Sequence, residues 1–105
     1  MNVAACTLSE TGRQTRAAEF SQLFGETVRS VKRPDPSWLQ LELKPGPAPA
    51  GRTAELAAAE TQCCSFFTFT LTAAAGSLIL DIRVPAAQAA VLDMLAERAA
   101  ASAAD

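Results

Sequence analysis

The chain has 105 residues, half of them apolar, and a formal net charge of −2. This length suits one domain with a modest core, so we expect residues 1–105 to form a single domain. The lack of a basic run disfavours direct binding of nucleic acid, and no segment is long enough for a membrane span. The first residues lack the positive charge and long apolar core of a signal peptide, so we expect a cytoplasmic protein.

The sequence contains three cysteines but no histidine and no tyrosine. An odd number of cysteines in a reducing compartment argues against a framework of disulfides. Without histidine, the chain lacks the commonest general base and the commonest metal ligand. Any functional site must therefore use cysteine, acidic, hydroxyl or basic side chains.

The first third of the chain predicts a strand followed by a helix. The short apolar run at residues 3–8 is typical of a strand. Residues 13–31 predict an amphipathic helix, because one stripe at helical spacing consists of Ala17, Phe20, Leu23, Phe24, Val28 and Val31. Pro34 and Pro36 prevent this helix from continuing.

The middle of the chain predicts a second strand and a second helix. Residues 38–44 alternate leucine with polar side chains, which is typical of a strand covered on one face. Residues 45–51 are rich in proline and glycine, and we expect them to form a short, stiff connector. Thr53 is the expected N-cap of a helix over residues 54–66.

The last third predicts a hairpin and a final helix. Residues 67–72 alternate apolar side chains with threonine, as strands do. A turn at residues 73–77 leads to another strand at residues 78–84, and we expect the two strands to pair antiparallel. Pro85 begins a helix over residues 86–100, because proline in a first helical turn costs no hydrogen bond.

The predicted order is thus β-α-β-α-β-β-α. Strands with one apolar and one polar face need cover on one side only. We therefore predict an α+β fold, a two-layer sandwich in which three helices cover one face of a mostly antiparallel four-stranded sheet.

Two adjacent cysteines, Cys63 and Cys64, stand where the helical pattern ends and the strand pattern begins. Thiolates favour soft ions such as Hg(II), As(III), Cu(I) or Zn(II). Neighbouring residues on a helix point about 100° apart, so both sulfurs reach one ion only if the helix ends there. Cys6 is a candidate third ligand and Glu60 a fourth. Three thiolates suit a three-coordinate soft ion better than a closed zinc site, which takes four ligands.

The sequence predicts, on this basis, a non-enzymatic module that binds or senses a soft metal or metalloid ion. The alternative that the cysteines only fill the hydrophobic core stays open, since cysteine is among the most buried residue types and packs as a small hydrophobe. Thiol redox catalysis is disfavoured, because the pair lies at a helix C-terminus and forms no CxxC motif. An enzyme with a small apolar pocket near residues 63–69 is a weaker alternative, and nothing in the sequence names its substrate.

A second hypothesis is a dimerisation or protein-interaction domain whose cysteines are purely structural. This hypothesis rests on one face of the predicted sheet, which carries Trp38, Thr68, Thr70 and Ile79. Such a face could meet the sheet of a second subunit, so a homodimer is a possible assembly.

Two stretches resemble a known domain: Cys-Thr-Leu-Ser at residues 6–9, and residues 59–71 with the core E-x-x-C-C-S-F-F. They are similar to a small bacterial domain of poorly defined function, found alone and behind the DNA-binding part of regulators of the mercury-resistance (MerR) type. The resemblance covers most of the chain loosely. It implies an effector-sensing module with a possible regulator partner and with Cys6, Cys63 and Cys64 as candidate ligands. The chain lacks a winged-helix segment, so we expect no DNA binding of its own.

Overall fold

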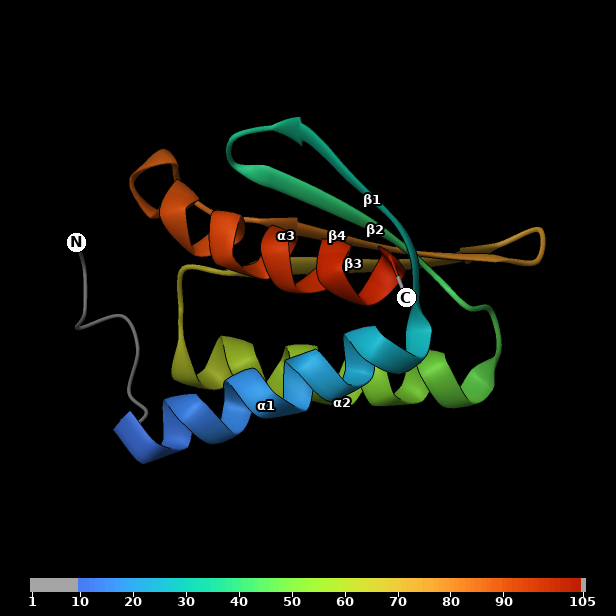
Figure 1. Ribbon diagram of the computed structural model, residues 1–105, viewed down its shortest axis with the longest axis horizontal. Helices are drawn as coiled ribbons and strands as arrows, with labels where there is room; N and C mark the ends of the chain where they lie inside the picture. Colours follow the sequence, from blue (N-terminus) through green and yellow to red (C-terminus); the bar gives the residue numbers. More distant parts are fainter. Residues whose placement is uncertain (1–9, 105) are drawn as a thin grey trace.

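A computed structural model describes residues 10–104 of the chain, with side chains from residue 16 to residue 101. Helices and strands alternate in the order α-β-β-α-β-β-α, with a short 3-10 turn before the last helix (Figure 1). The elements are α1 (Glu10–Thr27), β1 (Val28–Asp35), β2 (Trp38–Leu43), α2 (Pro47–Cys63), β3 (Thr68–Ala74), β4 (Ser77–Arg83), η2 (Ala86–Gln88) and α3 (Ala89–Ala104).

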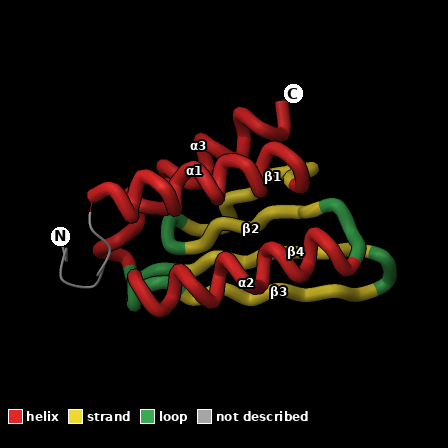
Figure 2. The backbone as a smooth tube through the Cα atoms, turned by 90° about the horizontal axis from the view of Figure 1, so that it is seen from below, coloured by secondary structure: helices red, strands yellow, loops and turns green. Residues whose placement is uncertain are grey.

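The four strands form one antiparallel sheet in the order β1-β2-β4-β3. Because side chains alternate along a strand, residues directly opposite one another across strands share a face. The two central strands bring six buried aliphatic side chains together in the pairs Leu39–Ile82, Leu41–Leu80 and Leu43–Leu78. This apolar face carries the helices, and no element within residues 10–104 covers the opposite face of the sheet (Figures 1 and 2).

The three helices complete the core from one side. Phe20 and Phe24 of α1 and Leu92 of α3 are almost fully buried in the same cluster as the central strands. α1 packs against both α2 and α3, while α3 covers β1 and β2 and α2 covers β3. The predicted α+β two-layer fold with an antiparallel four-stranded sheet is therefore confirmed.

The predicted helix over residues 13–31 extends too far, because α1 ends at Thr27 and the chain continues directly into β1. The Thr27 hydroxyl donates to the carbonyl of Leu23 at 2.6 Å, and the Thr27 carbonyl accepts from the Lys44 amide at 2.7 Å. The valines after Thr27 fit a helical stripe and a strand equally well, and the pairing with β2 decides for the strand. The fourth strand of the sheet is thus β1, and the strand predicted at residues 3–8 lies outside the described residues.

The expected connector at residues 45–51 is also wrong from its third residue onwards, because α2 already begins at Pro47. Helical N-termini accept proline, since their first amides have no partner within the helix. Gly46 precedes the helix with φ at 131°, a conformation that favours glycine. Thr53 is no N-cap but lies inside α2, where its hydroxyl donates to the Pro49 carbonyl at 2.8 Å.

The predicted C-terminal hairpin and final helix are confirmed. β3 and β4 pair antiparallel without interruption from Thr68–Arg83 to Ala74–Ser77. Ala75 and Gly76 form the two-residue turn, with φ at 52° and 77°, as a type I′ hairpin requires. α3 follows Pro85 after the single turn η2.

Candidate functional site

Helix α2 ends at Cys63, three residues before the predicted bound at residue 66, and thus between the two adjacent cysteines. Cys63 is its last residue, and Cys64 leaves it in an extended conformation with φ −127° and ψ 94°. The amide of Cys64 still donates to the Glu60 carbonyl at 2.7 Å, which closes the last helical turn. The chain then turns through residues 65–67 and enters β3.

The two cysteines differ in exposure. Cys64 is 5% exposed and belongs to the hydrophobic core, where Phe67 also lies. Cys63 is half-buried and packs against the rim of that core. No disulfide joins the two residues. Cys63 is therefore the more accessible thiol of the pair.

A charged cluster adjoins Cys63 and links the end of α2 to α1. The Arg16 guanidinium donates to Oε1 of Glu60 at 2.8 Å and forms a longer ion pair with Glu19 at 3.4 Å. The same guanidinium interacts with the thiol of Cys63. Glu60 is only 8% exposed, so Arg16 supplies the charge that a buried carboxylate requires.

Burial and charge shift the pKa values of this cluster. Burial raises the pKa of Glu60 above its ordinary value, although the Arg16 guanidinium lowers it in part. Burial also lowers the pKa of Arg16, but Glu60 and Cys63 outweigh it, so the net pKa of Arg16 is raised. Arg16 is thus a cation that contacts both the Glu60 carboxylate and the Cys63 thiol.

Sequence reasoning missed this cluster, because Arg16 lies 44 residues before Glu60. A signal for it exists on α2, because Glu60 follows the buried residues Thr53 and Ala57 at helical spacing. A carboxylate on the buried side of a helix needs a cationic partner. The sequence does not identify that partner, since several arginines occur in α1 and elsewhere.

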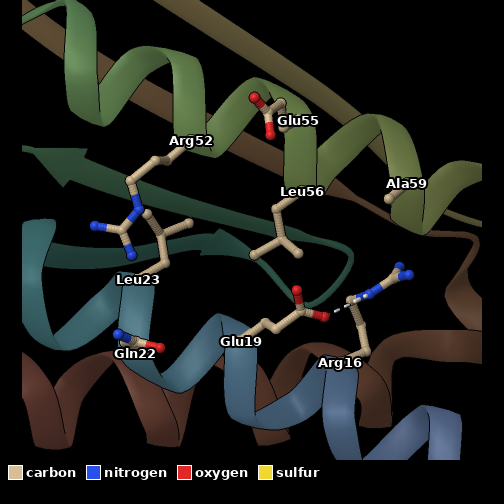
Figure 3. A pocket seen from close by; sticks show the side chains of 8 residues that line it. All are labelled: Arg16, Glu19, Gln22, Leu23, Arg52, Glu55, Leu56 and Ala59. Carbon is tan, nitrogen blue, oxygen red and sulfur yellow. Dashed lines mark ion pairs between the residues drawn. The ribbon is translucent and has the colours of Figure 1, made fainter.

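A groove of about 300 Å³ runs between α1 and α2 beside the cluster (Figure 3). Leu23 and Leu56 contribute apolar surface to it, and Arg16 and Arg52 stand towards its opposite ends. Arg52 is paired with Glu26 across the two helices. The groove therefore has a mixed lining, in which the carboxylates of Glu19 and Glu55 accompany the two cations and the leucines. Arg16 belongs both to the groove and to the thiol cluster.

The predicted metal ligands are only partly brought together. Cys63, Cys64 and Glu60 lie within one turn at the end of α2, while Cys6 lies outside the described residues. Among the side chains that the structure describes, no group of three or more cysteine, aspartate or glutamate residues is arranged to hold a metal ion. Whether Cys6 completes a site with Cys63 and Cys64 stays a prediction.

The face of the sheet without helices carries the residues of the second hypothesis. The Trp38 indole and the Gln40 amide both donate to Oδ1 of Asp81, at 2.7 and 3.0 Å. The Arg83 guanidinium stacks on the Trp38 ring, 4.4 Å from its centroid. The other predicted residues of this face lie beside this network, namely Thr68, Thr70 and Ile79. The face is thus polar and largely satisfied by its own contacts.

Comparison of the chain with protein-family models, with curated proteins and with solved structures found no match. The resemblance to the bacterial sensing domain therefore stays a prediction. No helix within residues 10–104 is long and apolar enough to cross a bilayer. The class that the structure defines is a two-layer α+β domain with a thiol pair at a helix end.

Proposed function

We propose that the protein is a non-enzymatic module that binds a soft metal or metalloid ion through Cys63 and Cys64, with Cys6 as a further ligand. The observation that carries the proposal is the end of α2 between the two thiols, with the Arg16 guanidinium beside Cys63. Because the helix ends between the two residues, the angle of about 100° between neighbouring helical side chains does not apply to this pair.

The chemistry of the ligands favours Hg(II), As(III) or Cu(I) over Zn(II). Each of these ions is stable with two or three sulfur ligands, whereas structural zinc takes four. Each thiol must lose its proton when it binds an ion. An arriving ion meets Cys63 first, since Cys64 is 5% exposed.

Glu60 has a supporting part in this proposal. Its carboxylate is held by Arg16 at 2.8 Å, so it fixes the guanidinium beside Cys63. To bind the metal ion itself, the Glu60 carboxylate would have to give up its hydrogen bond with Arg16. We therefore propose that Glu60 positions Arg16 in the ion-free protein and is the least important member of the predicted ligand set.

The test is a titration of the reduced protein with Hg(II) and with arsenite, followed by isothermal calorimetry and mass spectrometry. Wild type is expected to bind one ion per chain, and a Cys63→Ser/Cys64→Ser double variant to bind much more weakly. The single variant Cys6→Ser measures the contribution of the N-terminal thiol. Equal, weak binding by wild type and the double variant would rule the proposal out.

A sensing role extends the proposal to a partner. The resemblance to C-terminal domains of MerR-type regulators suggests a cytoplasmic module that passes the presence of a soft ion to a regulator. Cytoplasmic conditions also keep the thiols reduced and available. The expected result is an ion-dependent complex with such a regulator in the same cell, and an association that ignores the ion would contradict sensing.

The alternative proposal is an interaction domain whose cysteines are structural. The observation that favours it is the burial of Cys64 in the hydrophobic core, where a thiol serves as a small apolar side chain. It predicts that native protein reacts slowly with a thiol reagent at both positions and fully only after unfolding. Rapid modification of Cys63 or Cys64 in the folded protein would count against this alternative.

A further inference from the structure

The two edges of the sheet are built differently. Among the strands that the structure describes, β1 forms one edge and β3 the other. β1 carries Arg29, Lys32, Arg33 and Pro34, and its pairing with β2 is irregular at two places. Charges, proline and bulges on an edge strand are the features that prevent further strands from adding to it. The β1 edge is therefore protected against pairing with another chain.

The β3 edge has none of these features. Its sequence from Thr68 to Ala74 contains no charged residue and no proline, and its pairing with β4 is regular throughout. Alternate N–H and C=O groups of an edge strand point away from its sheet and are open to another strand. β3 thus presents an uncharged edge of seven residues, and no described strand lies beyond it.

Helix α2 continues this uncharged surface above the strand. Ala54, Ala58 and Thr61 are exposed along the side of α2 that faces the β3 edge. Between them and the half-buried side chains of Phe69 and Leu71 lies an apolar groove of about 270 Å³. In Figure 2, α2 and β3 run along the same border of the molecule. The strand and the helix therefore form one continuous border.

We infer that β3 pairs antiparallel with β3 of a second copy of this chain, which joins the two sheets into one of eight strands. A twofold axis across the pair places each strand against its own sequence, so a charge on β3 would face the same charge or a near neighbour. β3 carries no charge, and its threonines can meet across the axis and form hydrogen bonds.

The groove also fits a second copy. The same twofold axis brings α2 of each copy to the same side of the joined sheet, with Ala54, Ala58 and Thr61 facing their counterparts. Small side chains allow helices to approach closely, at interaxial distances of roughly 8–10 Å. An added peptide strand alone would satisfy the backbone of β3 but would leave both apolar grooves open. A second copy covers strand and groove together.

The uncovered face of the sheet is a poorer candidate for this contact. Trp38, Gln40 and Asp81 satisfy one another by hydrogen bonds, and Arg83 is held on the Trp38 ring. Burial of that face would remove water from exposed charges such as Glu42 and Lys32. The β3 edge carries no such cost, because its outward groups are backbone amides that a second strand satisfies.

Sedimentation equilibrium tests the inference on the full chain with its thiols reduced and no metal added. Wild type is expected to dimerise at about 100 μM or below. Ala58→Glu places like charges across the twofold axis and is expected to weaken the dimer at least about tenfold. The matched control is Ala90→Glu, an exposed alanine of α3 distant from β3, which should leave the dimer unchanged.

Amide hydrogen exchange identifies the surface that is used. In the dimer, consecutive amides from Phe69 to Ala73 are expected to exchange slowly, whereas Ala58→Glu should return every second one to rapid exchange. A strictly monomeric wild type would overturn the inference. A dimer of equal strength in all three proteins, with alternate β3 amides still exchanging rapidly, would overturn it as well and point to another surface.

Discussion

Arg16 connects two features that are separate in the sequence. It lies on α1, yet its guanidinium holds Glu60 and adjoins Cys63 at the far end of α2. The ion pair with Glu60 is largely shielded from water, so it is not weakened by solvent as a surface pair would be. One side chain therefore influences the ionisation of the Glu60 carboxylate and also contacts the Cys63 thiol.

Replacement of Arg16 should slow the reaction of Cys63 with iodoacetamide. Nearby cations promote the alkylation of thiols in general, and the Arg16 guanidinium is the cation beside Cys63. We expect Arg16→Gln to lower the rate at pH 7 several-fold, measured by mass spectrometry of the peptide that contains Cys63. Arg52→Gln is the control, because Arg52 borders the same groove but pairs with Glu26. Equal rates in Arg16→Gln and wild type would show that the guanidinium does not activate the thiol.

Glu60 should make the stability of the protein decrease as the pH rises from about 4.5. Burial raises its pKa in the folded protein above the ordinary value of 4.5, so the folded state holds the proton longer than the unfolded state. The stabilising contribution is complete below pH 4.5 and is lost as the pH rises through the folded pKa.

The substitution Glu60→Gln should remove this pH-dependent contribution to the free energy of unfolding. Urea unfolding between pH 4 and 7 is expected to give a flatter pH profile for Glu60→Gln than for wild type, with wild type relatively more stable at the acidic end. Glu55→Gln, a change at an exposed position of the same helix, serves as the control. Parallel profiles for wild type and Glu60→Gln would contradict a raised pKa.

At the scale of elements, the sequence predicted well where one periodicity stood alone. The alternation of leucine in β2 and of threonine in β3 fixed both strands to within two residues of their bounds. Prediction failed where two periodicities overlap, because Val28 and Val31 fit a helix and a strand equally. Pairing with β2 makes these residues a strand, and the sequence alone does not reveal that pairing. The start of α2 was missed because prolines were taken as a connector, whereas a first helical turn accepts them.

The β3–β4 hairpin offers a stabilising substitution. Ala75 has φ at 52°, a left-handed conformation that costs most side chains about 1 kcal/mol but suits asparagine. Ala75→Asn is therefore expected to raise the free energy of unfolding by about 0.5–1 kcal/mol in urea titrations. Ala74→Asn, one residue earlier in β3, should be neutral or destabilising, because strands disfavour asparagine. A loss of stability in Ala75→Asn would argue against the type I′ turn.

At the scale of the molecule, one-sided apolar strands were enough to predict a single helical layer. The same reasoning did not give the candidate site in full. Adjacent cysteines and a change of periodicity located the end of α2, but the contact between Arg16 and Glu60 spans 44 residues and depends on how α1 packs. The expected third thiol, Cys6, lies outside the described residues, so the complete ligand set is still a prediction.

Dimer formation should make thermal stability depend on protein concentration. A contact present only in the folded state stabilises it by mass action. We expect the melting temperature of wild type to rise over a hundredfold range of concentration, measured by calorimetry, and that of Ala58→Glu to stay constant. A melting temperature of wild type that is independent of concentration would argue against a folded dimer.

The unequal edges of the sheet also limit the size of any assembly. A chain with two open borders would add further copies without end and grow into fibrils. Here the charged, proline-containing border of β1 offers no second point of attachment, so growth stops once the β3 borders have met. Removal of that block, for example by Pro34→Thr together with Lys32→Thr and Arg33→Thr, is the change that should turn a finite particle into a polymer.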